Sequence, residues 1–254
     1  MLETILRAAG KKLLHTQSAI DCREKSESDF VTEVDLSVHA ELGTQLASLV
    51  PGSRVISEED AAPQAYGEGA VWIIDPVDGT SNLVYGLRHS CISAALVENG
   101  RALLGAVYNP YLHEYFSAEK GKGAFLNGRP IHVSAAGSLE KAFVGFEAGP
   151  ASKHRSQRML TAFSRCHARA NGVRMLGSAA LDLAYVACGR FTCAYFDYMY
   201  PWDYAAGTLL IAEAGGLLTD LEGKAPDFSG CSAFVASNRI VHHEMLESTR
   251  LPGI

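Results

Sequence analysis

The sequence predicts a layered α/β (α+β) fold, in which helices cover mixed and antiparallel sheets. Two segments with apolar residues at helical spacing open the chain. Strand candidates separated by short turns follow, and the second half alternates between helices and strands. No Pro/Ser-rich linker, charge block or repeat divides the 254 residues, so we expect a single domain over residues 1–254.

The first part of the chain is predicted to place two helices before a run of strands. Apolar residues recur at helical spacing in residues 2–16 and 32–49, and Pro51-Gly52 ends the second segment. Residues 21–30 between them are polar and have no period, which predicts a loop. Strands are expected over residues 54–57, 71–74, 90–97, 102–108 and 114–118, the last three at hairpin spacing.

The second half is predicted to mix helices and strands more evenly. Helices are expected over residues 152–166, 178–188, 202–214 and 241–249, and strands over residues 142–146, 191–196, 216–219 and 233–236. Gly215-Gly216 follows the third of these helices, as is typical of a helix C-terminus.

The composition narrows the class of protein. A hydrophobic content of 48% is enough for a large core, and the net charge of -6 argues against a nucleic-acid partner. No stretch is long and uncharged enough to cross a bilayer, so we expect no membrane partner, and the N-terminus does not have the pattern of a signal peptide. The six cysteines have no paired spacing, which predicts free thiols in a reducing, cytoplasmic compartment.

The most informative segment is Asp75-Pro-Val-Asp78-Gly-Thr-Ser-Asn. It follows the buried strand over residues 71–74, and Pro76 is expected to end that strand because it has no N–H. The turn would bring Asp78 beside Asp75, and residues 79–81 would offer backbone N–H groups at a helix start. Two carboxylates beside an anion site suit Mg²⁺ bridging to a phosphate. The alternative is an ordinary turn in which Asp78 is a helix N-cap.

Glu58 and Asp203 are candidates for the same site, and each also has a simpler explanation. Glu58 follows a predicted strand, so it would lie beside Asp75 if the two strands are neighbours, although acidic runs are usually solvated loops. Asp203 opens a helix, where an N-cap role would explain it. The small residues 205–207 that follow it would let this helix approach another element closely.

The segment Asp29-Phe-Val-Thr-Glu-Val-Asp35 is a weaker candidate. Thr32 and Asp35 are placed to cap the following helix, and Asp35 is alternatively placed to accept a hydrogen bond from a catalytic hydroxyl. Taken singly, none of these four elements is decisive. Their joint occurrence is much less expected by chance.

Together the motifs resemble the inositol monophosphatase family, whose members are Mg²⁺-dependent, lithium-sensitive phosphatases. The matching segments are residues 29–35, 58–59, 75–82 and 202–207, in the family's order and at closely similar spacing, with lesser matches at 121–128 and 213–216. The resemblance covers nearly the whole chain. It implies an αβαβα sandwich, a metal- and phosphate-binding half over about residues 1–140, a second half over about 141–254, and a homodimer.

The resemblance also implies a role for individual residues. The Mg²⁺ ligands would be the first acid of the Glu-Glu pair, both aspartates of the Asp-Pro-x-Asp turn with the backbone carbonyl between them, and the aspartate after Trp202: Glu58, Asp75, Val77, Asp78 and Asp203. Glu58, Thr80 and Asp35 would be catalytic, with the Asp35–Thr80 pair orienting a metal-activated water for in-line attack on the phosphate. The substrate would contact a larger set: Asp78, Gly79, Thr80, Ser81, Gly177, Ser178, Ala179, Asp197 and Asp203. Residues 21–30 align with a mobile lid, from which Lys25 would approach the metals.

One departure from the family pattern bears on the substrate. Inositol-selective members carry a glutamate seven positions before the metal-binding aspartate, and that position here is Phe196, with Asp197 as the nearest acid. The resemblance implies a phosphomonoester hydrolase of the inositol-1-monophosphatase type, acting on a small phosphorylated polyol or sugar. Fructose 1,6-bisphosphate, histidinol phosphate and nucleotide 3′-phosphates are alternative substrates. A non-catalytic protein-binding module on the same fold is the alternative of another class, and the intact acids argue against it.

Overall fold

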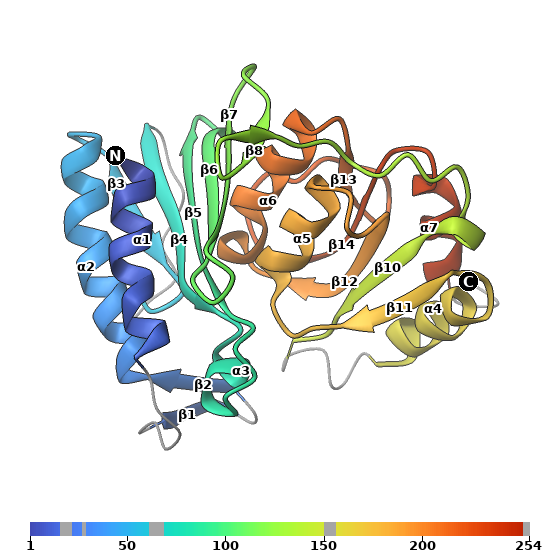
Figure 1. The fold of residues 1–254 in the computed structure, drawn as a ribbon, viewed down its shortest axis with the longest axis horizontal. Helices are drawn as coiled ribbons and strands as arrows, with labels where there is room; N and C mark the ends of the chain where they lie inside the picture. Colours follow the sequence, from blue (N-terminus) through green and yellow to red (C-terminus); the bar gives the residue numbers. More distant parts are fainter. Residues whose placement is uncertain (16–21, 27–28, 61–68, 150–155, 251–254) are drawn as a thin grey trace.

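A computed structural model gives the fold of the chain and describes residues 1–15, 22–26, 29–60, 69–149 and 156–250. Five layers follow one another across the molecule (Figure 1). Helices α1 (Leu2–Leu14) and α2 (Glu33–Leu49) form the first layer, and a seven-stranded sheet forms the second. Helices α5 (Ala179–Ala187) and α6 (Pro201–Glu213) separate it from a five-stranded sheet, which α4 (Ser156–Arg169) and α7 (His242–Thr249) cover. The expected αβαβα sandwich is therefore confirmed.

The larger sheet has the strand order β3-β4-β5-β6-β7-β8-β9. Only β3 and β4 pair in parallel, and each later neighbour is antiparallel to the one before it. The carboxyl ends of β3 and β4 therefore lie at the same edge of the sheet, as the placement of Glu58 beside Asp75 required. The strand bounds are β3 (Arg54–Ser57), β4 (Ala70–Asp78), β5 (Cys91–Glu98), β6 (Arg101–Asn109), β7 (Glu114–Glu119), β8 (Ala124–Leu126) and β9 (Arg129–Pro130).

The smaller sheet has the strand order β11-β10-β12-β14-β13. Strand β10 is parallel to both of its neighbours, whereas β14 is antiparallel to β12 and β13. The carboxyl ends of β10 and β12 therefore lie together, and Glu147 is directly beside Phe196. The strand bounds are β10 (Phe143–Glu147), β11 (Gly172–Met175), β12 (Cys193–Met199), β13 (Leu217–Asp220) and β14 (Ser232–Ser237).

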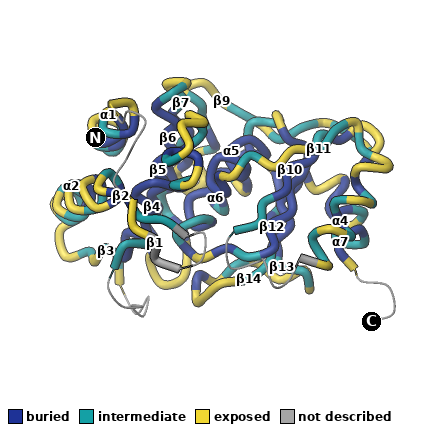
Figure 2. The backbone as a smooth tube through the Cα atoms, turned by 90° about the horizontal axis from the view of Figure 1, so that it is seen from below, coloured by how far each residue is buried: buried dark blue, intermediate teal, exposed yellow. Residues whose placement is uncertain are grey.

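Three apolar clusters of the described residues hold the layers together. The first helical layer packs against the larger sheet around the fully buried Trp72. The second cluster lies between the two sheets and includes most of α5 and α6, and the third joins the smaller sheet to α4 and α7. Figure 2 shows the result, with buried backbone concentrated in the central helices and the strands beside them. All six cysteines are free, as predicted.

Small residues in α6 allow a close approach, as the sequence predicted. A Cβ atom on Gly207 would lie 2.5 Å from Leu183 Cδ1 of α5, and one on Gly105 of β6 would lie 2.8 Å from Ala206 O. Side chains at these positions would push the central helices away from the larger sheet and from each other. The approach matters for function because α6 begins at the site described below.

Residues 21–30 depart from the prediction of a loop. They contain β1 (Cys22–Ser26) and β2 (Asp29–Thr32), which pair in an antiparallel hairpin at the lower edge of the molecule in Figure 1. A hairpin is built from backbone hydrogen bonds, so its polar side chains need not show a period of two. Strands β8, β9 and β11 and the 3₁₀ turn Leu139–Lys141 were also not predicted, because they are short and lack such a period. The start of the predicted helix over 152–166 falls partly outside the described residues. No described helix has both the length and the apolar character needed to cross a membrane.

Candidate active site

Strand β4 carries both aspartates of the informative turn. It continues through Pro76 as far as Asp78, and its pairing with β5 is irregular between Asp75 and Asp78. The prediction that Pro76 ends the strand is therefore wrong. A proline is tolerated at such a bulge, because the unpaired residue there need not donate to the ladder. Inside the bulge, the Val77 N–H donates to Asp75 Oδ1 at 3.0 Å and holds the carboxylate in place.

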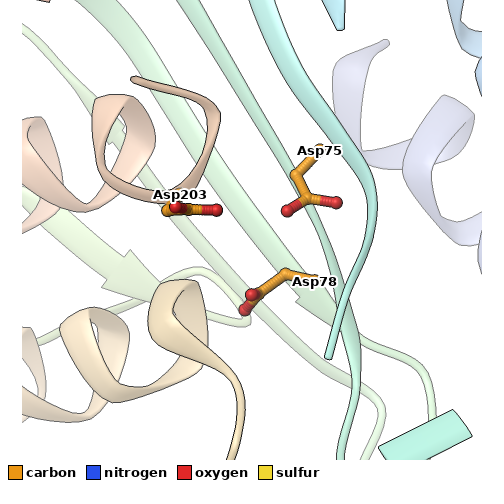
Figure 3. Close-up of side chains that lie close together, drawn as sticks. All are labelled: Asp75, Asp78 and Asp203. Carbon is orange, nitrogen blue, oxygen red and sulfur yellow. The ribbon is translucent and has the colours of Figure 1, made fainter. Parts of the chain in front are cut away.

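Asp75 and Asp78 meet a third carboxylate from the other half of the chain. One oxygen from each of Asp75, Asp78 and Asp203 lies within 4.8 Å of the others. Figure 3 shows Asp203 at the start of α6 facing the two aspartates of β4. Asp203 is also held locally, since its Oδ2 accepts a hydrogen bond from the Tyr200 N–H at 2.7 Å. Asp203 thus lies beside the other acids and at the same time caps its own helix.

Burial and neighbouring negative charges raise the pKa of Asp75 and of Asp203. Burial raises the pKa of Asp75 well above its ordinary value, and the negative charges of Glu58, Asp78 and Asp203 raise it further. Burial and the charges of Asp78 and Glu58 act in the same way on the pKa of Asp203. Glu58 therefore belongs to the same electrostatic cluster. Its backbone N–H bonds to Ile74 O across the parallel β3–β4 pair at 3.3 Å.

This donor set fits a hard divalent cation such as Mg²⁺. Clustered oxygens of carboxylates are the ligands that Mg²⁺ takes in proteins, and a cation would remove the repulsion among them. Among the described residues, none of the ion pairs includes Asp75, Asp78 or Asp203. The negative charge of the cluster is thus not neutralised by a described lysine or arginine.

Asp78 also ties the site to α5. Its carboxylate accepts hydrogen bonds from the Ser178 hydroxyl at 2.5 Å, the Ala180 N–H at 2.9 Å and the Ala179 N–H at 3.2 Å. Burial raises the pKa of Asp78, and these hydrogen bonds oppose the rise. Ser178 occupies the N-cap position of α5, yet its hydroxyl binds Asp78 rather than its own helix. Asp78 is thus not the cap of the helix that follows it, whose N-cap is Gly79.

Asp35 and Thr80 are brought together as the resemblance implied. The Thr80 hydroxyl donates to Asp35 Oδ1 at 2.9 Å and lies 2.9 Å from Val77 O. The other oxygen of Asp35 accepts from the Thr32 N–H at 2.9 Å and caps α2. Asp35 therefore both caps α2 and accepts from the Thr80 hydroxyl, because each contact uses a different oxygen of the same carboxylate. Burial raises the pKa of Asp35, and its bonds to the two threonines oppose this.

Gly79 joins the start of α3 (Thr80–Val84) to the loop before α5. Its φ of +89° lies in the left-handed region, and a Cβ atom there would be 2.9 Å from Gly177 O. The Asn82 amide reinforces the contact by donating to Leu176 O at 2.7 Å and to Gly177 O at 3.0 Å. The predicted phosphate-contacting and substrate-contacting segments, residues 79–81 and 177–179, are therefore side by side.

Asp197 is the one predicted substrate contact that the structure does not bring to the cluster. Its Oδ1 accepts from the Tyr195 hydroxyl at 2.5 Å, and Tyr195 packs with α4 and α7. Phe196 instead packs in the central cluster with α5 and α6. Asp197 thus lies on the face of β12 that is turned away from these helices. The side chain of Lys25 lies outside the described part of the chain.

Two acids near the site were missed by the sequence analysis. Glu147 ends β10, and burial together with the charge of Asp78 raises its pKa to about 7. Asp182 on α5 is fully buried, and burial, then the charges of Glu147 and Asp78, raise its pKa well above the ordinary value. Neither oxygen of Asp182 has a hydrogen-bond partner among the described residues. Glu147 directly follows a predicted strand, as Glu58 does, and this position could have indicated Glu147 as a candidate site residue.

Comparison with known proteins gives a consistent result. Residues 1–251 match the model of the inositol monophosphatase family. A fructose-1,6-bisphosphatase/inositol-1-monophosphatase of Thermotoga maritima is 36% identical over 96% of this chain and 92% of its own. The Nus factor SuhB of Pseudomonas aeruginosa is 36% identical over 95% of this chain and 90% of its own. The solved structure of an IMPase/NADP phosphatase complexed with Mg²⁺ and phosphate is 27% identical, covers 99% of this chain and 93% of that one, and gives a TM-score of 0.85.

Proposed function

The chain belongs to the inositol monophosphatase family and is a phosphomonoester hydrolase, and we propose that it acts on phosphorylated polyols or sugars with Mg²⁺ as cofactor. Inositol 1-phosphate is the leading substrate. The observation that carries the proposal is the convergence of Asp75, Asp78 and Asp203 within 4.8 Å, beside a glycine turn at a helix start. The relative whose structure holds Mg²⁺ and phosphate supports the choice of cofactor.

The residues that would hold the cation are the carboxylates of the cluster and one carbonyl: Glu58, Asp75, Val77, Asp78 and Asp203. Bound Mg²⁺ would stabilise charge on the phosphoryl oxygens and lower the pKa of an attacking water. The N–H groups of residues 79–81 are placed to bind the phosphate, because an N-terminal turn of a helix favours an anion. Asp203, which faces the two aspartates of β4, would join the second half of the chain to the first through the bound cation.

Thr80 and Asp35 would position the attacking water. Because the Thr80 hydroxyl donates to Asp35, its oxygen is left to accept a hydrogen bond from a water molecule. The Thr32 N–H anchors Asp35 from the other side, so the pair has little freedom to turn. Asp35 is thereby placed to receive a proton through Thr80 as the water attacks. Glu58 is proposed to act in catalysis as a ligand of the cation that activates the water.

Several further properties are proposed on the strength of the family. They are inhibition by lithium, assembly as a homodimer and a cytoplasmic location. We also propose that residues 1–254 act as one domain, since the cluster combines β4 of the first half with α6 of the second. Gly177, Ser178 and Ala179 remain proposed substrate contacts.

Two alternatives are favoured by the names of relatives. Fructose 1,6-bisphosphate is the second candidate substrate, because the Thermotoga maritima relative is named for that activity as well. A partner-binding role is the second class of function, because another relative is named a Nus factor. Retention of the whole acidic cluster supports catalysis, since binding a protein partner would not require it.

Phosphate release from purified protein tests the proposal. The substrates are inositol 1-phosphate, fructose 1,6-bisphosphate, histidinol phosphate and a nucleotide 3′-phosphate, each with Mg²⁺ and with a chelator. We expect release from at least one of them, only with Mg²⁺, and release more than about 100-fold slower from Asp75→Asn. If none of the four releases phosphate with Mg²⁺ present, the assignment of these substrates is wrong.

A further inference from the structure

Glu147 lies beside Phe196, the position at which inositol-selective members of the family carry a glutamate. Position 196, seven residues before Asp203, holds a phenylalanine and provides no polar group. Strand β10 runs parallel to β12, and Glu147 is the direct partner of Phe196 in the ladder. Partners in a parallel ladder project their side chains to the same face of the sheet. Glu147 therefore projects toward α5 and α6, as Phe196 does.

The carboxylate of Glu147 is held at the edge of the proposed active site. Its Oε2 accepts from the Gly177 N–H at 3.0 Å, and its Oε1 accepts from the Ala148 N–H at 3.2 Å. Gly177 is the residue whose carbonyl approaches Gly79 at the phosphate end of the site. The negative charge of Glu147 also acts on Asp203, and that of Asp78 acts on Glu147. The carboxylate thus binds the turn before α5 and is close enough to Asp78 and Asp203 for their charges to act on one another.

Glu147 retains the capacity to bind a substrate. A carboxylate has about four acceptor positions, and the backbone N–H groups of Ala148, Gly177 and Ser178 use only part of them. The residue as a whole is half-buried, so it retains some exposed surface. Asp197, the nearest acid in the sequence, lies on the other face of β12, where its Oδ1 accepts from the Tyr195 hydroxyl.

We propose that Glu147 is a specificity-determining residue, whose carboxylate accepts hydrogen bonds from hydroxyl groups of the polyol or sugar attached to the phosphate. The inference rests on the proposed function, because it assigns a contact within that active site. It places the recognition of hydroxyls on β10 rather than on β12. The substrates it favours carry hydroxyl groups close to the phosphate ester, as a cyclic polyol does.

Steady-state kinetics with two substrates test the proposal. Inositol 1-phosphate carries the hydroxyls in question, whereas p-nitrophenyl phosphate has a leaving group without any. Glu147→Gln keeps the shape and removes the charge. A hydrogen bond to a charged group contributes about 1.5–3 kcal/mol, so we expect kcat/KM for inositol 1-phosphate to fall by about 10–100-fold. For p-nitrophenyl phosphate we expect a change of less than about threefold, since no such bond is lost.

The matched control is Glu98→Gln. It makes the same chemical change at the exposed end of β5 that lies away from Asp75, and both substrates should be unaffected. Glu147→Asp, which withdraws the charge by one methylene, is the second variant and should show the same selective loss. The conclusion therefore does not depend on the folding of a single protein.

Three results would overturn the proposal. An equal loss on both substrates would mean that Glu147 only holds the Gly177 turn, and an unchanged kcat/KM for both substrates would mean that it does not contact the substrate. A selective loss in Asp197→Asn without one in Glu147→Gln would return the role to β12. If the wild-type protein hydrolyses neither substrate with Mg²⁺, the proposed function has failed as well. If it hydrolyses both but the ratio does not change in the variants, only this inference has failed.

Discussion

The two sides of the proposed active site are built in different ways. The metal side consists of the β4 bulge and the start of α6, and each of its acids lies in a short sequence motif. The hydroxyl side consists of the loop before α5 and the ends of β10 and β12, and its residues become neighbours only through strand pairing. The chemistry of the site can therefore be inferred from local sequence. Its substrate selectivity depends on which strands lie beside each other.

The difference has a physical cause. A divalent cation needs several acids at fixed positions. Because these buried carboxylates repel one another, they in turn need the cation to offset their charge. A hydroxyl group needs only one well-placed acceptor, which any neighbouring strand can provide. Changes on the metal side should consequently affect every substrate equally. Changes on the hydroxyl side should alter the ratio between substrates.

The largest effect is expected from Asp75→Asn. The side chain makes one described hydrogen bond, from the Val77 N–H, so the fold should tolerate the amide. Removal of a ligand charge should lower kcat/KM by more than the 10–100-fold that is typical of outer partners of a metal site. The loss should be the same for inositol 1-phosphate and p-nitrophenyl phosphate, measured as phosphate release. A selective loss on one substrate would break the division into two sides.

A smaller but still large effect is expected from Thr80→Val. The variant has a similar shape and cannot donate to Asp35, so the water would lose its orienting group. We expect kcat to fall by about 100-fold on both substrates, which is the low end of the range for proton-transfer catalysis. Thr80→Ser restores the hydroxyl and should recover most of the rate. If the valine and serine variants have equal rates, the hydroxyl has no role in catalysis.

Ser178→Ala tests the hydrogen bond by which the loop before α5 supports Asp78 on the metal side. Its hydroxyl supports Asp78, which keeps the N–H groups of Ala179 and Ala180 in the variant. We expect about a tenfold rise in the Mg²⁺ concentration that gives half-maximal rate, because the group orients a ligand without being one. The titration should shift alike for both substrates. An unchanged Mg²⁺ dependence would contradict a link from α5 to the metal ligands.

The smallest effect concerns the pH dependence of stability, and here the site and the remote His242 act in opposite directions. Burial lowers the pKa of His242 to about 4, and its ring nitrogens are within 2.9 Å of the Thr219 hydroxyl and 2.8 Å of the Ser237 hydroxyl. As the pH falls below about 6.5, the unfolded chain takes up a proton that the folded protein excludes. Stability from this group is therefore complete at neutral pH and is lost as the pH falls toward 4.

The acids of the site give the reverse dependence in the metal-free protein. Their pKa values are raised, so the folded protein keeps protons that the unfolded chain releases as the pH rises above about 4. Chemical unfolding of metal-free protein at several pH values separates the two contributions. His242→Gln should flatten the loss of stability on the acid side only, and Asp75→Asn the loss on the neutral side only. If His242→Gln has the same acid slope as the wild-type protein, the histidine is not excluded from protonation.

Much of the architecture could be predicted because the main elements carry strong local signals. The paired helices and the strands around Trp72 have clear apolar periods, and the structure contains them within a few residues of the predicted bounds. The β1–β2 hairpin and strand β11 could not be predicted in this way. They are short and held by backbone pairing, which leaves no pattern in the side chains.

The candidate site shows the same limit. Asp75, Asp78 and Asp203 were identified from their motifs, and the structure brings them together. The β4 bulge was mistaken for the end of a strand, because a proline that stops a regular ladder can still occupy an irregular one. Glu147 was not found, since its importance comes from lying beside Phe196. Neighbouring strands in this sheet are distant in sequence, so a single sequence does not show which residues they align.

Calorimetric titration of Mg²⁺ into Asp203→Asn and into the wild-type protein addresses most directly whether both halves of the chain hold a common cation. Asp203 comes from α6, whereas Asp75 and Asp78 come from β4. We predict that the wild-type protein binds Mg²⁺ and that the variant binds it at least about tenfold more weakly while keeping its far-ultraviolet circular dichroism. Equal affinity in the two proteins would contradict a shared metal site.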